Sequence, residues 1–159
     1  MIKITIIALG KLKEKYLREA SAEYEKRLSR YCKLDIIELE PVRLNEKPSQ
    51  SEIDLALQKE SEMIIKKIPA GSQVYSLCVE GKQFSSEDFA KKNEYIFSKG
   101  GSLTFIIGSS YGLDKKVKNL SDVRLSLSEM TFPHQLFRVM LLEQIYRSFK
   151  ISEGSTYHK

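Results

Sequence analysis

The feature that most constrains the fold of this chain is a regular alternation of short apolar runs with amphipathic stretches. Five apolar runs, five to eight residues long, are typical of β-strands and end in glycine, a polar turn or a charged loop. We predict them at residues 2–9, 34–39, 73–79, 102–107 and 123–127. Strands that alternate with helices favour a mostly parallel sheet with helices on both faces, so we predict an α/β fold.

The stretches between these runs predict helices. In the first, Leu12, Tyr16, Ala20 and Tyr24 recur every four residues among charged ones. We predict helices at residues 11–32, 51–68, 85–99, 113–119 and 133–151, with caps at Ser51 and at a capping box that begins at Ser85. No repeat, low-complexity segment or linker divides the chain, so we predict one domain over residues 1–159.

Composition limits the classes of partner. The net charge of +5 and the isoelectric point of about 9.1 favour an anionic partner, with nucleic acid the commonest, although a solvated lysine-rich face gives the same balance. The two cysteines, Cys32 and Cys78, have no metal-ligand spacing, and no apolar stretch is long enough to cross a bilayer. We therefore expect a cytoplasmic protein without a leader peptide, a metal or a membrane partner.

The predicted topology also indicates where a ligand would bind. In sheets of this kind ligands lie at the carboxyl ends of strands, which here follow Leu77, Ile107 and Leu127. The loop Gly108–Gly112 is neither a G-x-G-x-x-G nucleotide motif nor a P-loop, so it is either a plain turn or a backbone cradle. The segment 127–132 could surround a flat heterocycle, and Ser128 or Thr131 could equally cap the following helix.

The last predicted helix is apolar on two sides. Leu136, Val139 and Met140 lie on one side, and Leu141, Ile145 and Phe149 extend the other. Such a helix is buried on more than one face, either by a second subunit or as a central core helix. The polar tail that follows ends in an aromatic, an imidazole and a cation, which suits RNA but is also typical of a frayed terminus.

Four segments together resemble a known family. They are "MIKITIIALGKLKEKYLREASAEYEKRL", "IIGSSYG", "LSLSEMTFPHQLFRVMLLEQIYRSFKI" and the closing "YHK". In spacing and total length they resemble the RlmH family, the large-subunit ribosomal RNA pseudouridine N3-methyltransferases of the SPOUT class. The resemblance covers most of the chain and is weakest over residues 41–67.

The resemblance implies a fold and a set of partners. The fold would be a single SPOUT domain with a C-terminal trefoil knot over about residues 102–151 and a tail at 152–159. The partners would be S-adenosylmethionine as methyl donor, a second copy in a homodimer, and 23S ribosomal RNA in the assembled ribosome. Such knots are rare among folds, and periodicity does not reveal them.

The resemblance also implies site residues by position. The cofactor pocket would comprise Leu77, Gly108, Leu127, Ser128, Glu129, Met130, Thr131 and Phe132. The catalytic residues would be Arg138, Tyr157 and His158, with the tail reaching the pocket of the other subunit. A cation, Arg138 or one from the tail, would stabilise the imide anion, while His158 either holds the base or removes its N3 proton. We expect His134 to brace the loop.

One position departs from the family pattern. The family's glycine loop commonly reads G-G-S-x-G, and here Ser109 stands at the second position. A serine with positive φ there would cost about 1 kcal/mol. Two other functions are compatible with the sequence: a non-enzymatic ribosome- or RNA-binding protein on the same fold, and a small-molecule α/β enzyme with incidental basicity.

Overall fold

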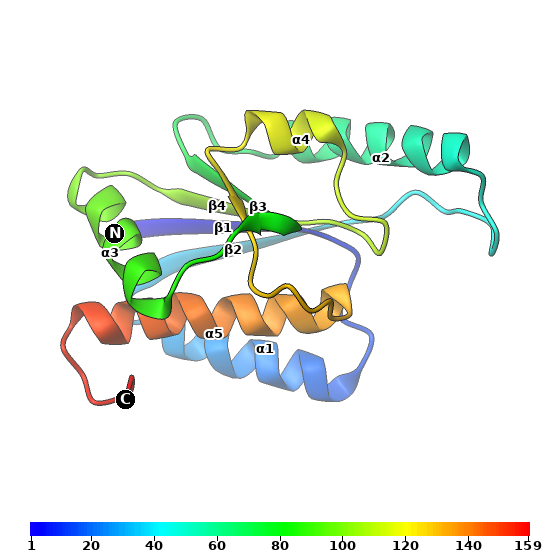
Figure 1. Cartoon of the computed structure of the whole chain (residues 1–159). Coiled ribbons are helices and arrows are strands. Elements are labelled where there is room, and N and C mark those ends of the chain that lie inside the picture. Colours follow the sequence, from blue (N-terminus) through cyan, green and yellow to red (C-terminus); the bar gives the residue numbers. More distant parts are fainter.

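The protein folds around one five-stranded sheet in which every neighbouring pair of strands is parallel (Figure 1). A computed structural model describes all residues 1–159. The strands are β1 (Ile2–Leu9), β2 (Cys32–Leu39), β3 (Gln73–Lys82), β4 (Leu103–Ile107) and β5 (Val123–Leu125), in the order β2-β1-β4-β3-β5. The predicted parallel α/β fold is confirmed, and all strand carboxyl ends lie at one edge of the sheet, called here the carboxyl edge.

Five helices cover the two faces of the sheet. They are α1 (Lys15–Leu28), α2 (Gln50–Ile65), α3 (Ser86–Ser98), α4 (Lys115–Leu120) and α5 (His134–Ser152). Helices α1, α3 and α5 pack on one face, and α2 and α4 pack on the other. The trefoil knot implied by the resemblance stays a prediction. No helix is long and apolar enough to cross a membrane.

The helix caps show where local prediction succeeds and fails. Ser85 caps α3 as predicted, because its Oγ accepts the N–H of Asp88 at 3.0 Å, but Asp88 does not return the second hydrogen bond of the predicted capping box. The cap of α2 is Ser49, which forms a reciprocal capping box with Glu52, so the prediction of Ser51 was wrong. The prediction that a serine or threonine caps α5 was also wrong. Pro133 occupies that position without a side-chain hydrogen bond, and its ring fixes φ near the helical value.

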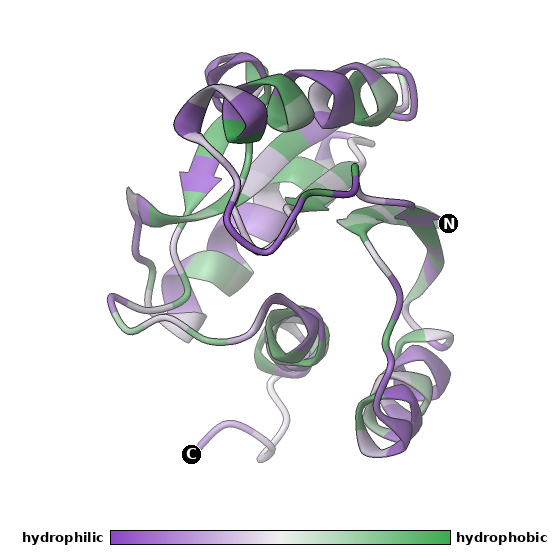
Figure 2. Cartoon of the chain, turned by 90° about the vertical axis from the view of Figure 1, so that its right-hand side faces the viewer, coloured by the Kyte–Doolittle hydropathy of each residue, from purple (hydrophilic) through white to green (hydrophobic).

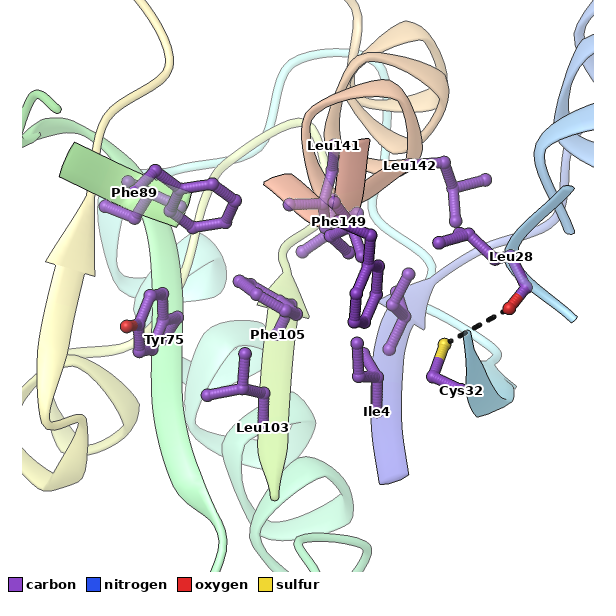
Figure 3. Close-up of a cluster of buried hydrophobic side chains, with 14 of the residues drawn as sticks. Ile4, Leu28, Cys32, Tyr75, Phe89, Leu103, Phe105, Leu141, Leu142 and Phe149 are labelled. Carbon is purple, nitrogen blue, oxygen red and sulfur yellow. Dashed lines mark hydrogen bonds between the residues drawn. The ribbon is translucent and has the colours of Figure 1, made fainter. Parts of the chain in front are cut away.

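The larger core lies between the sheet and α1, α3 and α5 (Figure 3). The ring centroids of Tyr75 and Phe105 are 5.1 Å apart in an edge-on arrangement, and Phe89 of α3 packs beside both. Edge-on aromatic pairs contribute about 0.5–1.5 kcal/mol beyond burial of their area. A smaller core on the other face joins Ile7 and Ile106 to α2 and α4. Burial on both faces explains the nearly uninterrupted apolar sequence of β4.

Helix α5 runs along the lower face of the sheet from the carboxyl edge to the opposite edge (Figure 1). Figure 2 faces the carboxyl edge and shows α5 nearly end-on, with α1 beside it. Leu141, Leu142 and Ile145 are buried, whereas Val139 and Met140 are only half-buried. The core therefore accounts for one apolar side of α5, and the other is partly open in the single chain.

Candidate functional site

The three strand ends singled out in the sequence meet around one cavity at the carboxyl edge. The cavity, called here the first cavity, has a volume of about 470 Å³, within the range typical of small-molecule sites. Six of the eight residues implied for the cofactor line it: Leu77, Gly108, Leu127, Ser128, Thr131 and Phe132. Glu129 and Met130 do not line it, and the Met130 side chain is 74% exposed.

The glycine loop forms a tight turn at the mouth of the first cavity. A Cβ at Gly108 would lie 2.4 Å from the carbonyl oxygen of Gly112, so this position excludes any side chain unless the loop moves. Gly112 adopts φ of +88°, whereas no residue other than glycine has positive φ. The strain that a positive φ at Ser109 would have caused therefore does not arise.

Ser109 instead ties the loop to a buried carboxylate on α2. Its Oγ donates to Glu60 Oε1 at 3.2 Å, and the N–H of Val42 donates to Glu60 Oε2 at 2.9 Å. Glu60 is 4% exposed, and its burial raises the pKa of the carboxyl group above the usual value. Sequence reasoning missed this residue. Its helical spacing between Ala56 and Ile64, on the buried side of α2, was the available signal.

The loop between β5 and α5 leaves several peptide groups without protein partners. The Ser126 hydroxyl donates to the carbonyl of Ser128 at 3.0 Å, and the Ser128 hydroxyl accepts the N–H of Met130 at 3.0 Å. The other N–H groups of residues 127–132 donate to no protein acceptor. Peptide groups of this kind can bind the polar edges of a heterocycle at the floor of a cavity.

The lining of the first cavity suits a flat, partly apolar ligand with polar edges. Leu77, Leu127 and Phe132 provide apolar surfaces for a purine ring, and the unpaired peptide groups of the loop match its polar edges. Glu80 and Lys118 also line the cavity, but they neutralise each other in an ion pair. No group of three or more His, Cys, Asp or Glu side chains could hold a metal ion.

The structure does not bring Arg138 into the first cavity. Its guanidinium pairs with Glu38 at 2.6 Å and donates to the carbonyl of Gly10 at 2.8 Å. The residue is only 5% exposed and lies under the β1–α1 loop. In this arrangement Arg138 joins the end of β2 to the β1–α1 loop at the carboxyl edge.

The tail lies against the second half of its own α5. Tyr157 donates to Glu143 at 2.8 Å, and the two ring nitrogens of His158 lie 3.1 Å from Arg147 and 2.7 Å from Glu87. Burial raises the pKa of the Tyr157 hydroxyl, and its hydrogen bond to Glu143 raises it further. No residue of the tail lines the first cavity, so the chain by itself does not unite the candidate catalytic residues with the candidate cofactor pocket.

Comparison of the whole sequence decides the family. A family model described as "Predicted SPOUT methyltransferase" matches residues 2–158. The protein named ribosomal RNA large subunit methyltransferase H from Acetivibrio thermocellus is 51% identical over 159 residues, covering 99% of this chain and all of the relative. The proteins of the same name from Clostridium acetobutylicum and Streptococcus suis are 50% and 48% identical with the same coverage. The chain belongs to the RlmH family of SPOUT methyltransferases.

A solved structure supports the fold of this RlmH family member independently of close sequence similarity. It is described as a probable methylase family protein from Haemophilus influenzae and superimposes with a TM-score of 0.56. The match covers 99% of this chain and 70% of the other at 12% identity, so it bears on the fold alone.

In this RlmH family member His134 lies between two cavities. It lines the first cavity and also a second one on the other side of the glycine loop. Burial lowers the pKa of His134 below its usual value, and the nearby charges of Arg138 and Lys13 lower it further. The bracing role expected for His134 stays a prediction.

Proposed function

We propose that the protein is an S-adenosylmethionine-dependent methyltransferase that methylates N3 of a pseudouridine in 23S ribosomal RNA. The assembled ribosome in the cytoplasm would be its substrate. The observation that carries the proposal is the convergence of Leu77, Gly108 and the 127–132 loop around one cavity of ligand size. Membership of a methyltransferase family and full-length relatives named for large-subunit ribosomal RNA support it.

The residues of the first cavity would hold the cofactor. S-adenosylmethionine supplies a methyl group bound to a sulfonium, which is already electrophilic. Peptide groups of the 127–132 loop would bind the adenine edge, while Leu77, Leu127 and Phe132 would pack on its faces. Gly108 would allow close approach of the loop, and Glu129 and Met130 would act through their backbone. The main task of the protein is then to place the target nitrogen in line with the methyl group.

The substrate side would be completed by a second subunit. A helix of nineteen residues is about 28 Å long, so the two ends of α5 lie far apart. Antiparallel packing of two α5 helices through their half-buried apolar sides would carry each tail toward the other subunit's first cavity. A homodimer therefore accounts for both the open side of α5 and the distance between tail and pocket.

Tyr157 and His158 of the other subunit would hold the flipped base and assist removal of the N3 proton. Tyr157 would stack on the base, and His158 would donate a hydrogen bond to it or accept its proton. Arg138 or Lys159 would stabilise the imide anion by its charge. For Arg138 this role requires that the guanidinium leave Glu38, which makes the tail cation the simpler source.

The experiment that tests the proposal is calorimetric titration with S-adenosylmethionine, followed by methyl transfer to purified ribosomes. Gly108→Trp should abolish binding, because even a Cβ at this position meets the loop backbone. Tyr95→Trp, at an exposed position on α3, is the control and should bind like the wild type. Binding by the wild type without methyl transfer to ribosomes would refute the assigned substrate. Ribosome binding without cofactor binding would favour a non-enzymatic RNA-binding protein.

A further inference from the structure

A second cavity of about 690 Å³ opens at the carboxyl edge beside the first. It is built by the β1–α1 loop, the β2–α2 loop, one side of α2 and the outer side of the glycine loop. The loop between β2 and α2 is polar and falls in the region where the family resemblance is weakest. The candidate cofactor pocket does not require this second cavity, so the role of its lining residues needs a separate explanation.

The accessible charge of the second cavity is positive. Lys11, Lys13 and Arg43 line it, are exposed, and take part in no ion pair. Two of the carboxylates at the cavity already have partners. Glu38 pairs with Arg138, and Glu60 accepts two hydrogen bonds from within the chain. Glu40 is the remaining carboxylate, so three free cations face one free anion.

The lining also contains apolar side chains. Pro41 and Leu44 come from the β2–α2 loop, and Ile53 and Leu57 come from α2. A cationic rim above an apolar surface matches a ligand with an anionic group on a flat ring, which is the chemistry of a nucleotide. A purely anionic ligand such as phosphate would not need the apolar part.

The two cavities share one wall. Ser109, Ser110, Tyr111 and His134 line both. Tyr111 is 46% exposed at this boundary and makes no hydrogen bond through its hydroxyl, so its ring is available for stacking. A ligand in the second cavity would therefore be the immediate neighbour of a base presented to the first.

We propose that the second cavity binds the nucleotide that neighbours the methylated nucleotide in the RNA strand. Its phosphate contacts Lys11, Lys13 and Arg43, and its base lies against the apolar side and Tyr111. The inference rests on the proposed function and extends it from the cofactor to the path of the substrate strand. A free mononucleotide has the same chemistry, and the test below separates the two sources.

The test uses the full-length protein and a fluorescein-labelled single-stranded oligouridylate of about ten nucleotides, a length within the range of single-strand binding sites. Fluorescence anisotropy compares the wild type with two matched triple variants. One variant replaces Lys11, Lys13 and Arg43 by alanine. The control replaces Lys66, Lys67 and Arg30, which are exposed and follow α2 or precede β2 at the opposite edge, so both variants lose two lysines and one arginine.

We expect the dissociation constant to rise about tenfold or more in the cavity variant and about twofold or less in the control. The dependence of log K on log salt should become shallower by about 2 in the cavity variant, since each phosphate contact on a single strand contributes about 0.7. Equal weakening in both variants, or no measurable binding by the wild type, would overturn the proposal. Tyr111→Ala, which removes no charge, should weaken binding without changing the salt dependence.

Two further readouts separate the possible failures. Uridine monophosphate that competes as well as the oligonucleotide would assign the cavity to a free nucleotide and overturn the RNA assignment. Calorimetry with S-adenosylmethionine should give the same affinity for the wild type and both triple variants. If the wild type does not bind the cofactor, the proposed function fails, while the two triple variants still decide whether RNA enters the second cavity.

Discussion

The two ends of α5 differ in what a single chain completes. At its first end the helix closes a cavity whose walls come from three strand ends of the same chain. At its last end the tail, which carries Tyr157 and His158, is folded onto the helix itself and does not line the first cavity. Under the proposed function, the cofactor half of the site would be built by the fold of one chain, and the substrate half would be completed by a second subunit.

The physical difference between these ends is how each is held. The strand ends are fixed by a buried parallel sheet, in which all five residues of β4 are buried. The tail is held by partly exposed polar contacts such as the pair between His158 and Glu87. Exposed polar pairs contribute about 0–1 kcal/mol each, so this contact holds the tail less firmly than burial holds the strand ends.

The largest expected effect concerns His158 and the last end of α5. His158→Ala should lower kcat at least about a hundredfold, because general acid–base groups contribute that much or more. The affinity for S-adenosylmethionine should remain that of the wild type, since the tail does not line the first cavity. Single-turnover methyl transfer and calorimetry measure the two quantities. An equal loss in both would show that the two ends of α5 are not separate.

Mixed dimers test whether the tail acts on the other subunit. Gly108→Trp and His158→Ala should each be inactive alone, whereas their mixture should regain about a quarter of wild-type activity if subunits exchange at random in a twofold-symmetric dimer. That mixed dimer contains one intact pocket and one intact tail, on different subunits. No recovery after verified exchange would mean that each tail serves its own pocket.

The ion pair at the first end of α5 should affect stability more than cofactor binding. Glu38→Gln leaves the guanidinium of Arg138 buried without a counter-charge and should lower the free energy of unfolding by about 3 kcal/mol. Arg138→Met should cost less, because Glu38 is partly exposed and can be hydrated. Urea denaturation gives both values. A loss of turnover in Arg138→Met at full stability would instead favour a direct catalytic role.

The smallest expected effect concerns Glu60 and the anchoring of the glycine loop. The pKa of Glu60 is higher in the folded than in the unfolded chain, so its ionised form costs stability at neutral pH. This cost disappears as the pH falls below the ordinary glutamate value of about 4.3. The difference in the free energy of unfolding, Glu60→Gln minus wild type, should therefore increase as the pH rises from about 4 to about 7.5. A difference independent of pH would refute the burial argument, and Ser109→Gly serves as a control that keeps the carboxylate.

Prediction from sequence worked where the signal was local or repeated along the chain. The order of strands and helices follows from apolar periodicity, and all ten elements are found within a few residues of their predicted positions. The ligand edge follows from the topology of parallel sheets, which explains why Leu77, Gly108 and Leu127 meet as expected. The prediction of a serine or threonine cap for α5 failed, because a proline can begin a helix without any side-chain hydrogen bond.

Other features depend on pairs of residues far apart in sequence. The ion pair between Arg138 and Glu38 spans one hundred positions, and the hydrogen bond between Ser109 and Glu60 spans forty-nine. No periodicity reports such a pair, and a charged residue within a helix is usually solvated. The second cavity was missed for the same reason, since its cations come from separate loops that only the folded sheet brings together.

The wall shared by the two cavities has a thermodynamic consequence. A ligand on one side that shifts Ser109, Tyr111 or His134 changes the free energy of binding on the other side, and linkage makes this coupling reciprocal. If both proposals hold, the factor by which S-adenosylmethionine changes the affinity for RNA equals the factor by which RNA changes the affinity for S-adenosylmethionine. The spent cofactor has lost its positive charge along with the methyl group, so it need not exert the same coupling. Methyl transfer would then weaken RNA binding. The glycine loop that separates the two cavities would link RNA release to the loss of the methyl group.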